Sequence, residues 1–161
     1  MAQSMSTIIA KANEYLNKAS LKARCHFVMS ENAGRENLLL GLITAIFSTI
    51  VGTTIFAAIA QKSQALWIQI ATGFMSVAAA VLAALQTFFR FSELSQQNKT
   101  AAVGYDKIKV SLDLFLLTFD PASTQTDQAL AALKSITEEL EKIEAASPSV
   151  PDSVFRKIVK G

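Results

Sequence analysis

Two long apolar runs without a single charged residue constrain this chain more than any other feature. The first, LLLGLITAIFSTIVGTTIFAAIA, covers residues 38–60, and the second, LWIQIATGFMSVAAAVLAALQTFF, covers residues 66–89. As a helix rising ~1.5 Å per residue, each run is long enough to cross a hydrocarbon core of ~30 Å. The polar turn between them, residues 61–65, is so short that the two helices must be antiparallel neighbours. The sequence therefore predicts a hairpin of two transmembrane helices.

The composition agrees with contact between part of the chain and lipid. Of the 161 residues, 51% are hydrophobic and 17% are charged, and the mean hydropathy of +0.34 is too high for a typical soluble domain. Trp67 at one end of the second run and Phe88, Phe89 and Arg90 at the other are typical interface anchors. The alternative is a soluble bundle in which both runs are buried helices, but charge-free runs of this length are uncommon there.

Basic residues lie on the flanks of the predicted hairpin rather than in its turn. The N-terminal flank carries Lys18, Lys22, Arg24 and Arg35, the C-terminal flank carries Arg90, Lys99, Lys107 and Lys109, and the turn carries only Lys62. By the positive-inside rule, we expect a multi-pass protein of the cell membrane with both termini cytoplasmic. The N-terminus lacks a signal-peptide pattern, so internal segments are expected to direct membrane entry.

Each predicted span has one face of small or weakly polar residues. On the first span these residues are Gly41, Ala45, Ser48 and Gly52, and on the second they are Gln69, Thr72, Ser76, Ala80, Ala83 and Thr87. Small residues let helices approach closely in lipid, so these faces are candidates for helix packing, the first face above all. Alternatively, the polar members of the second face line a pore. These candidate pore-lining residues are Gln69, Thr72, Ser76 and Thr87. Two helices alone cannot enclose water, so a pore requires a homo-oligomer in the membrane lipid.

The predicted domain organisation has three consecutive parts. We expect an N-terminal amphipathic cytoplasmic helix over residues 1–36, the hairpin over residues 37–90, and a stalk helix, a return helix and a C-terminal tail over residues 91–161, all as one continuous unit. The expected fold class is therefore an all-α membrane protein. It combines a two-transmembrane antiparallel hairpin with a cytoplasmic helical bundle of three main helices and a short C-terminal helix.

Apolar residues recur at helical spacing in each predicted cytoplasmic helix. They are Ile8, Ala12, Tyr15, Ala19, His26 or Phe27, and Ala33 in the first helix, Leu94, Ala101, Tyr105, Ile108, Leu112, Phe115 and Phe119 in the stalk, and Leu130, Leu133, Thr137, Leu140 and Ile143 in the return helix. The stalk is expected to continue from the second span and to stop at Asp120 and Pro121, and Ser123 or Thr124 is the expected cap of the return helix. In the tail, Asp152 is a candidate cap, and residues 154–159 are expected to dock through Phe155 and Ile158.

Several single residues are candidates for sensing or binding. His26 is the only histidine, and it is either a pH or ligand switch or a structural residue with one hydrogen bond. Tyr105 lies on the stalk seam, where its ring can pack while its hydroxyl reaches a partner such as His26. Arg24, Arg35 and Arg90 are candidates to contact a nucleotide phosphate or a lipid phosphate, or to act as plain interfacial anchors.

The sequence does not favour an enzyme. Cys25 beside His26 suggests a nucleophile and a base, yet neighbouring helical residues point ~100° apart and no third group is evident to orient them. No phosphate-binding loop, nucleophile elbow or metal-ligand spacing occurs, so no catalytic residue, metal or cofactor is expected. The net charge of +2 with interspersed signs offers no basic stripe for nucleic acid. A small enzyme that uses Cys25 or His26 remains an alternative.

Three segments and their order carry a family resemblance over nearly the whole chain. They are CHFVMSENAGRENL before the first span, FSELSQQNKTAAVGYDKI after the second span, and the closing SPSVPDSVFRKI, with the hairpin and its short polar turn between the first two. This layout resembles the SLATT family of bacterial two-transmembrane effector proteins. The resemblance implies a pore-forming effector of antiviral defence in the bacterial inner membrane. It also implies a trigger, either a cyclic nucleotide or a separately encoded sensor protein, because no fused sensor domain is recognised here.

Two functions are therefore expected. The first is an oligomeric pore-forming or channel-like membrane effector. The alternative is a membrane-anchored scaffold or receptor whose cytoplasmic helical bundle binds a nucleotide or a protein partner.

Overall fold

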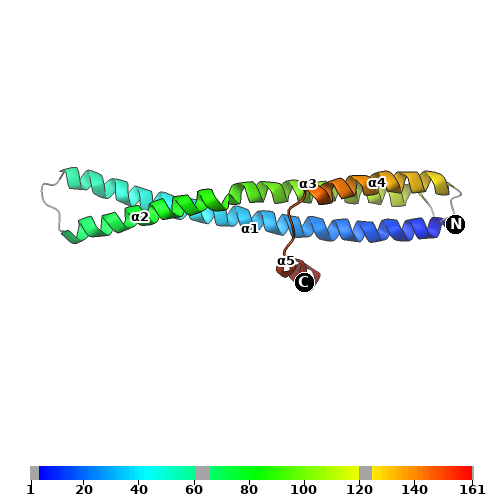
Figure 1. The fold of residues 1–161 in the computed structure, drawn as a ribbon, viewed down its shortest axis with the longest axis horizontal. Helices are drawn as coiled ribbons and strands as arrows, with labels where there is room; N and C mark the ends of the chain where they lie inside the picture. Colours follow the sequence, from blue (N-terminus) through cyan, green and yellow to red (C-terminus); the bar gives the residue numbers. More distant parts are fainter. Residues whose placement is uncertain (1–3, 61–65, 120–124, 161) are drawn as a thin grey trace. The chain divides into compact units, whose positions relative to one another are not determined.

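The computed structural model of this chain is built from helices (Figure 1). It describes residues 4–60, 66–119 and 125–160, and the side chains of all of these except 55–60. The helices within these residues, where no strand occurs, are α1 (Met5–Ala60), α2 (Leu66–Phe89), α3 (Phe91–Thr118), α4 (Thr126–Ala146) and α5 (Asp152–Lys160). The predicted all-helical fold is confirmed. The predicted turn at 61–65, the predicted stop at Asp120 and Pro121, and the predicted caps Ser123 and Thr124 lie outside the described residues.

The chain divides into two compact units. The first, called the bundle unit here, contains Met1–Glu31 and Ser95–Gly161, and the second, the hairpin unit, contains Asn32–Leu94. Helix α1 contributes residues to both units, and so does α3.

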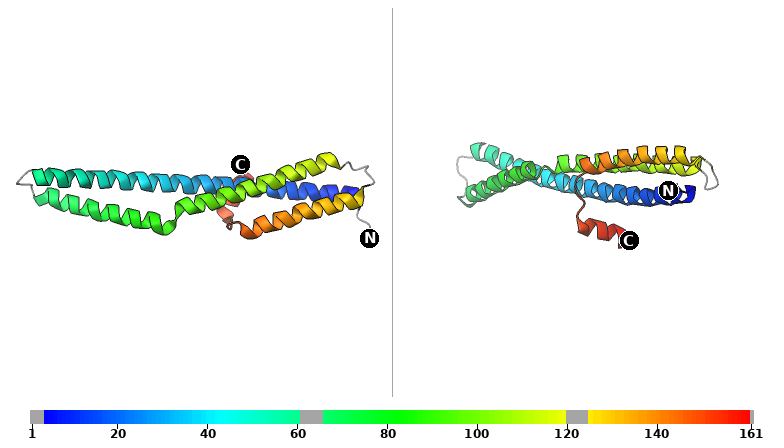
Figure 2. Two further views of the ribbon diagram at one scale, coloured as in Figure 1. Left: turned by 90° about the horizontal axis from the view of Figure 1, so that it is seen from above. Right: turned by 45° about the vertical axis from the view of Figure 1, so that its right-hand side comes forward.

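In the bundle unit, α1, α3 and α4 pack around one apolar core, and α3 and α4 run side by side (Figure 2). Buried residues recur every seven positions, as Met5, Ala12 and Ala19 do on α1 and as Tyr105 and Leu112 do on α3. This spacing is the heptad pattern of coiled coils. The buried core consists of Met5, Ile8, Ala12, Ala19 and Ala23 from α1, Ala101, Tyr105, Ile108, Leu112 and Phe115 from α3, and Ala129, Leu133 and Leu140 from α4. Alanines on α1 allow close approach of the other helices, whose larger side chains fill the space.

The structure decides one core position that the sequence left open and corrects two others. His26, not Phe27, is the buried member of its pair, and Phe27 is 40% exposed. Leu130 is 43% exposed, because Ala129 takes the core position one residue earlier on α4. Leu94 is 39% exposed and belongs to the hairpin unit rather than to the core of the bundle unit. The rest of the predicted stalk seam from Ala101 to Phe115 is buried as expected.

The hairpin unit places large apolar side chains on its outside. Of the residues 66–89 that form α2, Ala79 alone is buried. The exposed large hydrophobic residues are Leu38, Leu39, Leu42, Ile43, Ile46 and Ile50 on α1 and Leu66, Trp67, Ile70, Phe74, Val77, Val81, Leu85, Phe88 and Phe89 on α2. Among the described residues, two helical stretches are long and apolar enough to cross a membrane, and their most apolar parts are almost entirely unburied. A core helix of a soluble protein would instead bury such a part.

The expected direct continuation of the second span into the stalk is interrupted at one residue. Helix α2 ends at Phe89, and Arg90 adopts a left-handed backbone with φ of 46° before α3 begins at Phe91. This conformation costs an L-residue about 1–2 kcal/mol. Two local contacts support it, because the backbone N–H of Leu94 donates to the carbonyl of Arg90 at 3.0 Å, and the Arg90 guanidinium pairs with Glu93 at 2.7 Å.

Helix α5 is longer than the segment predicted for the tail, and of the two residues expected to dock, Phe155 is exposed and Ile158 is half-buried. None of its residues is buried, and Phe155 is 38% exposed. Within the bundle unit, α5 stands clear of the other helices at the end of the segment that follows α4 (Figures 1 and 2). The structural reason is that the residues 147–151, which contain Pro148 and Pro151, lead the chain away from α4.

Candidate functional site

A hollow of about 380 Å³ lies between the two helices of the hairpin unit. Its walls are small or weakly polar, and they consist of Thr44, Ser48, Val51 and Gly52 from α1 and Ser76, Ala79, Ala80 and Ala83 from α2. The structure thus brings Ser48 and Gly52 of the first small face opposite Ser76 of the second. Ala45 is exposed and is not part of the wall.

Gly41 lies close to a side chain of α2. A Cβ atom at this position would lie 3.3 Å from Nε2 of Gln86 on α2. The same Nε2 donates a hydrogen bond to Oδ1 of Asn37 at 3.3 Å. The pair therefore ties the two helices together at one end of the small face, where a larger side chain at position 41 would displace Gln86.

The hydroxyl groups of the hairpin unit differ in whether they have partners. Thr44, Thr72 and Thr87 each donate to a backbone carbonyl four residues earlier, at 2.8 to 3.0 Å. Ser48 and Ser76 have no hydrogen-bond partner among the described residues, although both line the hollow. Both serines are exposed, so their hydroxyl groups are accessible to a further polar partner.

The four candidate pore-lining residues share one side of α2. Steps of three, four and eleven residues at about 100° each place Gln69, Thr72, Ser76 and Thr87 within an arc of about 60°. Gln69, Ser76 and Thr87 are exposed, and Thr72 is half-buried. Of these four, Ser76 alone lines the hollow, and a single hairpin encloses none of them fully.

The three candidate arginines are exposed, and no polar contact among the described residues joins them into one site. Arg24 belongs to the bundle unit, whereas Arg35 and Arg90 belong to the hairpin unit. Arg90 already pairs with Glu93.

A buried polar cluster surrounds His26 in the bundle unit. His26 and Asn98 are 1% and 0% exposed, and Nδ1 of His26 lies 2.9 Å from Oδ1 of Asn98. Because an amide oxygen only accepts, Nδ1 carries the proton and donates. The Tyr105 ring stacks on the His26 ring at 5.5 Å with an interplanar angle of 10°. The expected contact between Tyr105 and His26 is therefore made by the ring faces rather than by the tyrosine hydroxyl.

A second polar pair extends this cluster along the same two helices. The hydroxyl of Ser95 donates to the backbone carbonyl of Ser30 at 2.9 Å, and the two hydroxyl oxygens lie 3.3 Å apart. Sequence reasoning missed Ser95 and Asn98. The signal for Asn98 was its position seven residues before Tyr105, on the same heptad seam.

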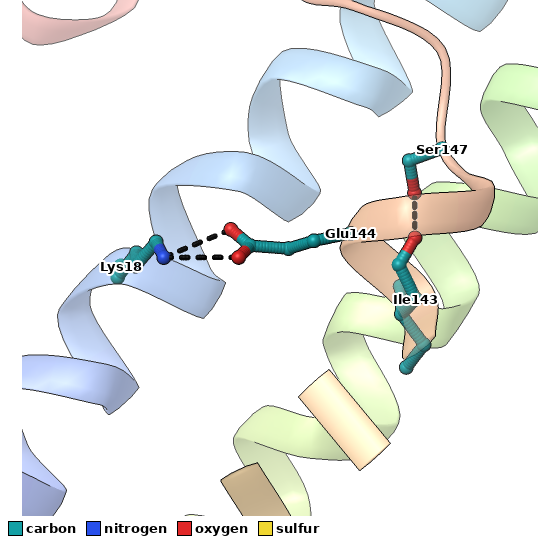
Figure 3. A network of polar contacts seen from close by, with 4 residues as sticks. All are labelled: Lys18, Ile143, Glu144 and Ser147. Carbon is teal, nitrogen blue, oxygen red and sulfur yellow. Dashed lines mark hydrogen bonds and ion pairs between the residues drawn. The ribbon is translucent and has the colours of Figure 1, made fainter. Parts of the chain in front are cut away.

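The Tyr105 hydroxyl lies on the side where α4 ends. Burial raises the pKa of Tyr105 above its usual value of 10.0, and a hydrogen bond with the Ser147 side chain opposes this shift. Nearby, Nζ of Lys18 on α1 contacts both carboxylate oxygens of Glu144 on α4, at 2.9 and 3.1 Å (Figure 3). The Ser147 hydroxyl donates to the carbonyl of Ile143 at 2.6 Å (Figure 3). These contacts hold the end of α4 against α1 and α3.

A groove of about 590 Å³ lies beside this end of α4, and sequence reasoning also missed it. Its lining residues come from α3 and from the last residues of α4. They are Gln96, Gln97, Lys99, Thr100, Ala101, Val103, Gly104 and Lys107 from α3, with Ile143, Ala146 and Ser147. Apolar walls with two lysines at the rim suit an anionic ligand with an apolar part.

The chemistry of Cys25 fits packing better than reaction. The side chain is fully buried, and this burial raises the pKa of its thiol above 9.0. Since the thiolate is the nucleophile, such a shift lowers reactivity at neutral pH. Among the described residues, no group of three His, Cys, Asp or Glu side chains is placed to hold a metal ion.

Comparison with known proteins gives one family match. The sequence model of a family described as "Protein of unknown function (DUF4231)" matches residues 28–104. The matched segment includes the entire hairpin unit, together with Ser30, Ser95 and Asn98 of the polar cluster. No curated protein and no solved structure matches the chain. The chain is therefore similar to this family over the hairpin and its immediate flanks.

Proposed function

We propose that this chain is a two-span membrane protein whose copies assemble into a pore, and that the bundle unit controls the assembly or its opening. The observation that carries the proposal is the contrast between the two sides of the hairpin unit. Large apolar side chains cover its outside, whereas the serine-lined hollow lies between its helices. A lipid environment accounts for the first feature, and a demand for water or further polar contacts accounts for the second.

The proposed spans are residues 38–60 and 66–89. Exposed apolar patches larger than a few hundred Å² are rare on soluble monomers, and burial in lipid removes the cost of exposing them to water. The basic flanks support an orientation with both termini in the cytoplasm. In this orientation the bundle unit is cytoplasmic.

The pore requires several hairpins in a ring. The shared face of Gln69, Thr72, Ser76 and Thr87 supports a role for α2 as the lining helix, because one polar arc on an apolar helix can face an aqueous path while the rest faces lipid. The spans carry no ionisable side chain, which favours a weakly selective path over a proton relay or a coupled transporter.

The biological role that we propose rests on the SLATT resemblance. It is an effector of bacterial antiviral defence in the inner membrane, which opens when a cyclic nucleotide or a separately encoded sensor protein acts on the bundle unit. The groove beside α4 supports this proposal, because Lys99 and Lys107 at its rim provide charges that a phosphate would need.

Ion flux from vesicles that contain the purified full-length chain tests the pore. Ser76→Leu fills the hollow and adds bulk to the proposed lining, so it should reduce flux strongly, whereas Val77→Leu, at an exposed apolar position one residue later, should not. Crosslinking in the same vesicles reports assembly. Equal flux for both variants with normal assembly would exclude Ser76 from the path, and no flux above protein-free vesicles under any trigger would reject the pore.

The second candidate function is a membrane-anchored receptor in which the hairpin only anchors. The groove beside α4 favours it, since its lining combines apolar residues with the exposed Lys99 and Lys107. In that case Ser76→Leu leaves activity intact, while Lys99→Glu combined with Lys107→Glu abolishes ligand binding and activity.

A further inference from the structure

Helix α5 has two sharply different sides. At about 100° per residue, its apolar side chains fall within an arc of roughly 140° and its cationic side chains within a separate arc of roughly 100°. The apolar face consists of Val154, Phe155, Ile158 and Val159, and the basic face consists of Arg156, Lys157 and Lys160. One carboxylate, Asp152, lies at the first residue, where the helix dipole favours it. Short helices of this composition are typical of membrane surfaces.

The apolar face is only partly covered, since Val154 and Ile158 are half-buried and the other two residues are exposed. Phe155 and Val159 are 38% and 59% exposed, and no α5 residue is buried. The groove beside α4 is the nearest candidate within the unit, but its rim carries Lys99 and Lys107, which would repel the basic face. A suitable partner therefore has an apolar layer for the apolar face and an adjacent negatively charged layer for the basic face. An anionic lipid surface has both layers.

Within the bundle unit, the end of α4 lies beside the first residues of α3 that belong to this unit. Ala146 and Ser147 line the same groove as Gln96 and Thr100 of α3. Gln96 is five residues beyond Phe91, the first residue of α3, which corresponds to about 7.5 Å along a helix axis. The five residues 147–151 span up to ~17 Å when extended. This segment is therefore long enough to carry α5 away from the end of α4.

We propose that α5 is a surface anchor that binds the cytoplasmic leaflet, with its apolar face among the acyl chains and its basic face at anionic headgroups. This inference rests on the membrane insertion proposed above. A nine-residue helix binds a membrane weakly by itself, but the hairpin would hold α5 beside the bilayer at high effective concentration. Docked α5 fixes the end of α4 relative to the membrane and so couples the lipid surface to the groove and to the Lys18–Glu144 contact.

The test places one tryptophan on α5 of the full-length chain. Trp67 is the only natural tryptophan, so Phe155→Trp on a Trp67→Phe background reports α5 alone. The protein is reconstituted into vesicles of phosphatidylethanolamine with phosphatidylglycerol, or into vesicles of phosphatidylcholine alone, each with acyl chains that are brominated or not. In the anionic vesicles, the introduced tryptophan should emit at shorter wavelength and be quenched by bromine.

Charge reversal on the basic face distinguishes binding to anionic headgroups from apolar contact with the acyl chains alone. Each of Arg156→Glu, Lys157→Glu and Lys160→Glu should lower the ratio of docked to undocked α5 at least about fivefold, from about 1 kcal/mol per cationic residue near an anionic surface. Lys142→Glu, at an exposed position on α4, is the matched control and should change the ratio less than about twofold.

Three results overturn the inference. An introduced tryptophan that bromine does not quench means that α5 stays off the bilayer. Equal quenching in both lipid mixtures, unaffected by charge reversal, rejects recognition of anionic headgroups. In the parent protein, Trp67 tests the hairpin itself: if bromine quenches Trp67 but not the tryptophan on α5, the anchor fails and the inserted hairpin stands, whereas no quenching of Trp67 rejects both.

Discussion

Replacing Asn98 with alanine should loosen the bundle unit by a predictable amount. Asn98 is fully buried, and its Oδ1 accepts a hydrogen bond from Nδ1 of His26 at 2.9 Å. Asn98→Ala leaves this buried N–H without its acceptor, at a cost of about 1–3 kcal/mol. Because 1.4 kcal/mol is a factor of ten, the equilibrium constant for opening the unit should rise about 5- to 150-fold.

The single cysteine reports this opening without further mutation. Cys25 precedes His26, is fully buried, and is the only cysteine of the chain. When closing is faster than labelling, the rate at which a thiol reagent modifies Cys25 is proportional to the opening constant. At fixed pH, Asn98→Ala should therefore be labelled about 5- to 150-fold faster than the parent. Asp106→Ala, at an exposed position on the same helix, is the control and should stay within about twofold.

A labelling rate for Asn98→Ala equal to that of Asp106→Ala would refute the reasoning, since it would mean that the buried contact contributes nothing net to stability. A double-mutant cycle with His26→Phe sharpens the result. If the two side chains act as a pair, their costs are non-additive by about 1 kcal/mol, because the second substitution removes a donor that the first has already left unpaired.

Three further predictions use the same labelling assay. Burial raises the pKa of Tyr105 above 10.0. The contribution of the neutral phenol to the free energy of unfolding is therefore fully present below pH 10, and it is lost as pH rises through the folded-state pKa. The rate of the parent relative to Tyr105→Phe should therefore rise above pH 10, by at most about 10-fold per pH unit, and a flat ratio would contradict burial of the phenol. Lys18→Met should raise the rate less than about fivefold, and less still in high salt, because a partly solvated pair such as Lys18 with Glu144 contributes about 0.2–1 kcal/mol. A larger increase in the labelling rate that does not depend on salt concentration would show that Lys18 acts through packing. Gly104→Val should raise the rate about 5- to 150-fold through overpacking of about 1–3 kcal/mol against Ile143. Gly104→Ala should stay within about fivefold, since its Cβ would lie 3.3 Å from a methyl group that can shift and alanine favours the helix. Equal rates for the two variants would show that α4 does not confine this position.

Much of the helical layout was predictable because hydrophobic periodicity is a local property. The seam from Ala101 to Phe115 follows directly from its three- and four-residue steps, and the structure buries it. The heptad on α1 was harder to see, because its core residues are mostly alanines, which carry little hydropathy contrast. Leu130 shows the limit of periodicity, since hydropathy alone ranks leucine above Ala129, whereas helix geometry places Ala129 in the core.

The candidate sites were predictable only in part. The small faces of the two spans indicated which residues would approach each other, and Ser48, Gly52 and Ser76 do line a common hollow. The groove beside α4 was not predictable, because it depends on where α4 ends against α3. The break at Arg90 was equally hidden, since an arginine gives no local signal for a left-handed backbone.

The sequence by itself determined that two charge-free runs form helices long enough to cross a bilayer and that amphipathic helices flank them. These features depend on residue type and spacing along one chain segment. Only the tertiary structure decided that His26 meets Asn98, 72 residues away, and that Tyr105 stacks on His26 instead of donating its hydroxyl to it. It also decided that α5 leaves Phe155 and Val159 exposed. The physical reason is that polar pairing and side-chain contact depend on the register between helices, which the close packing of whole side chains sets and no single segment contains.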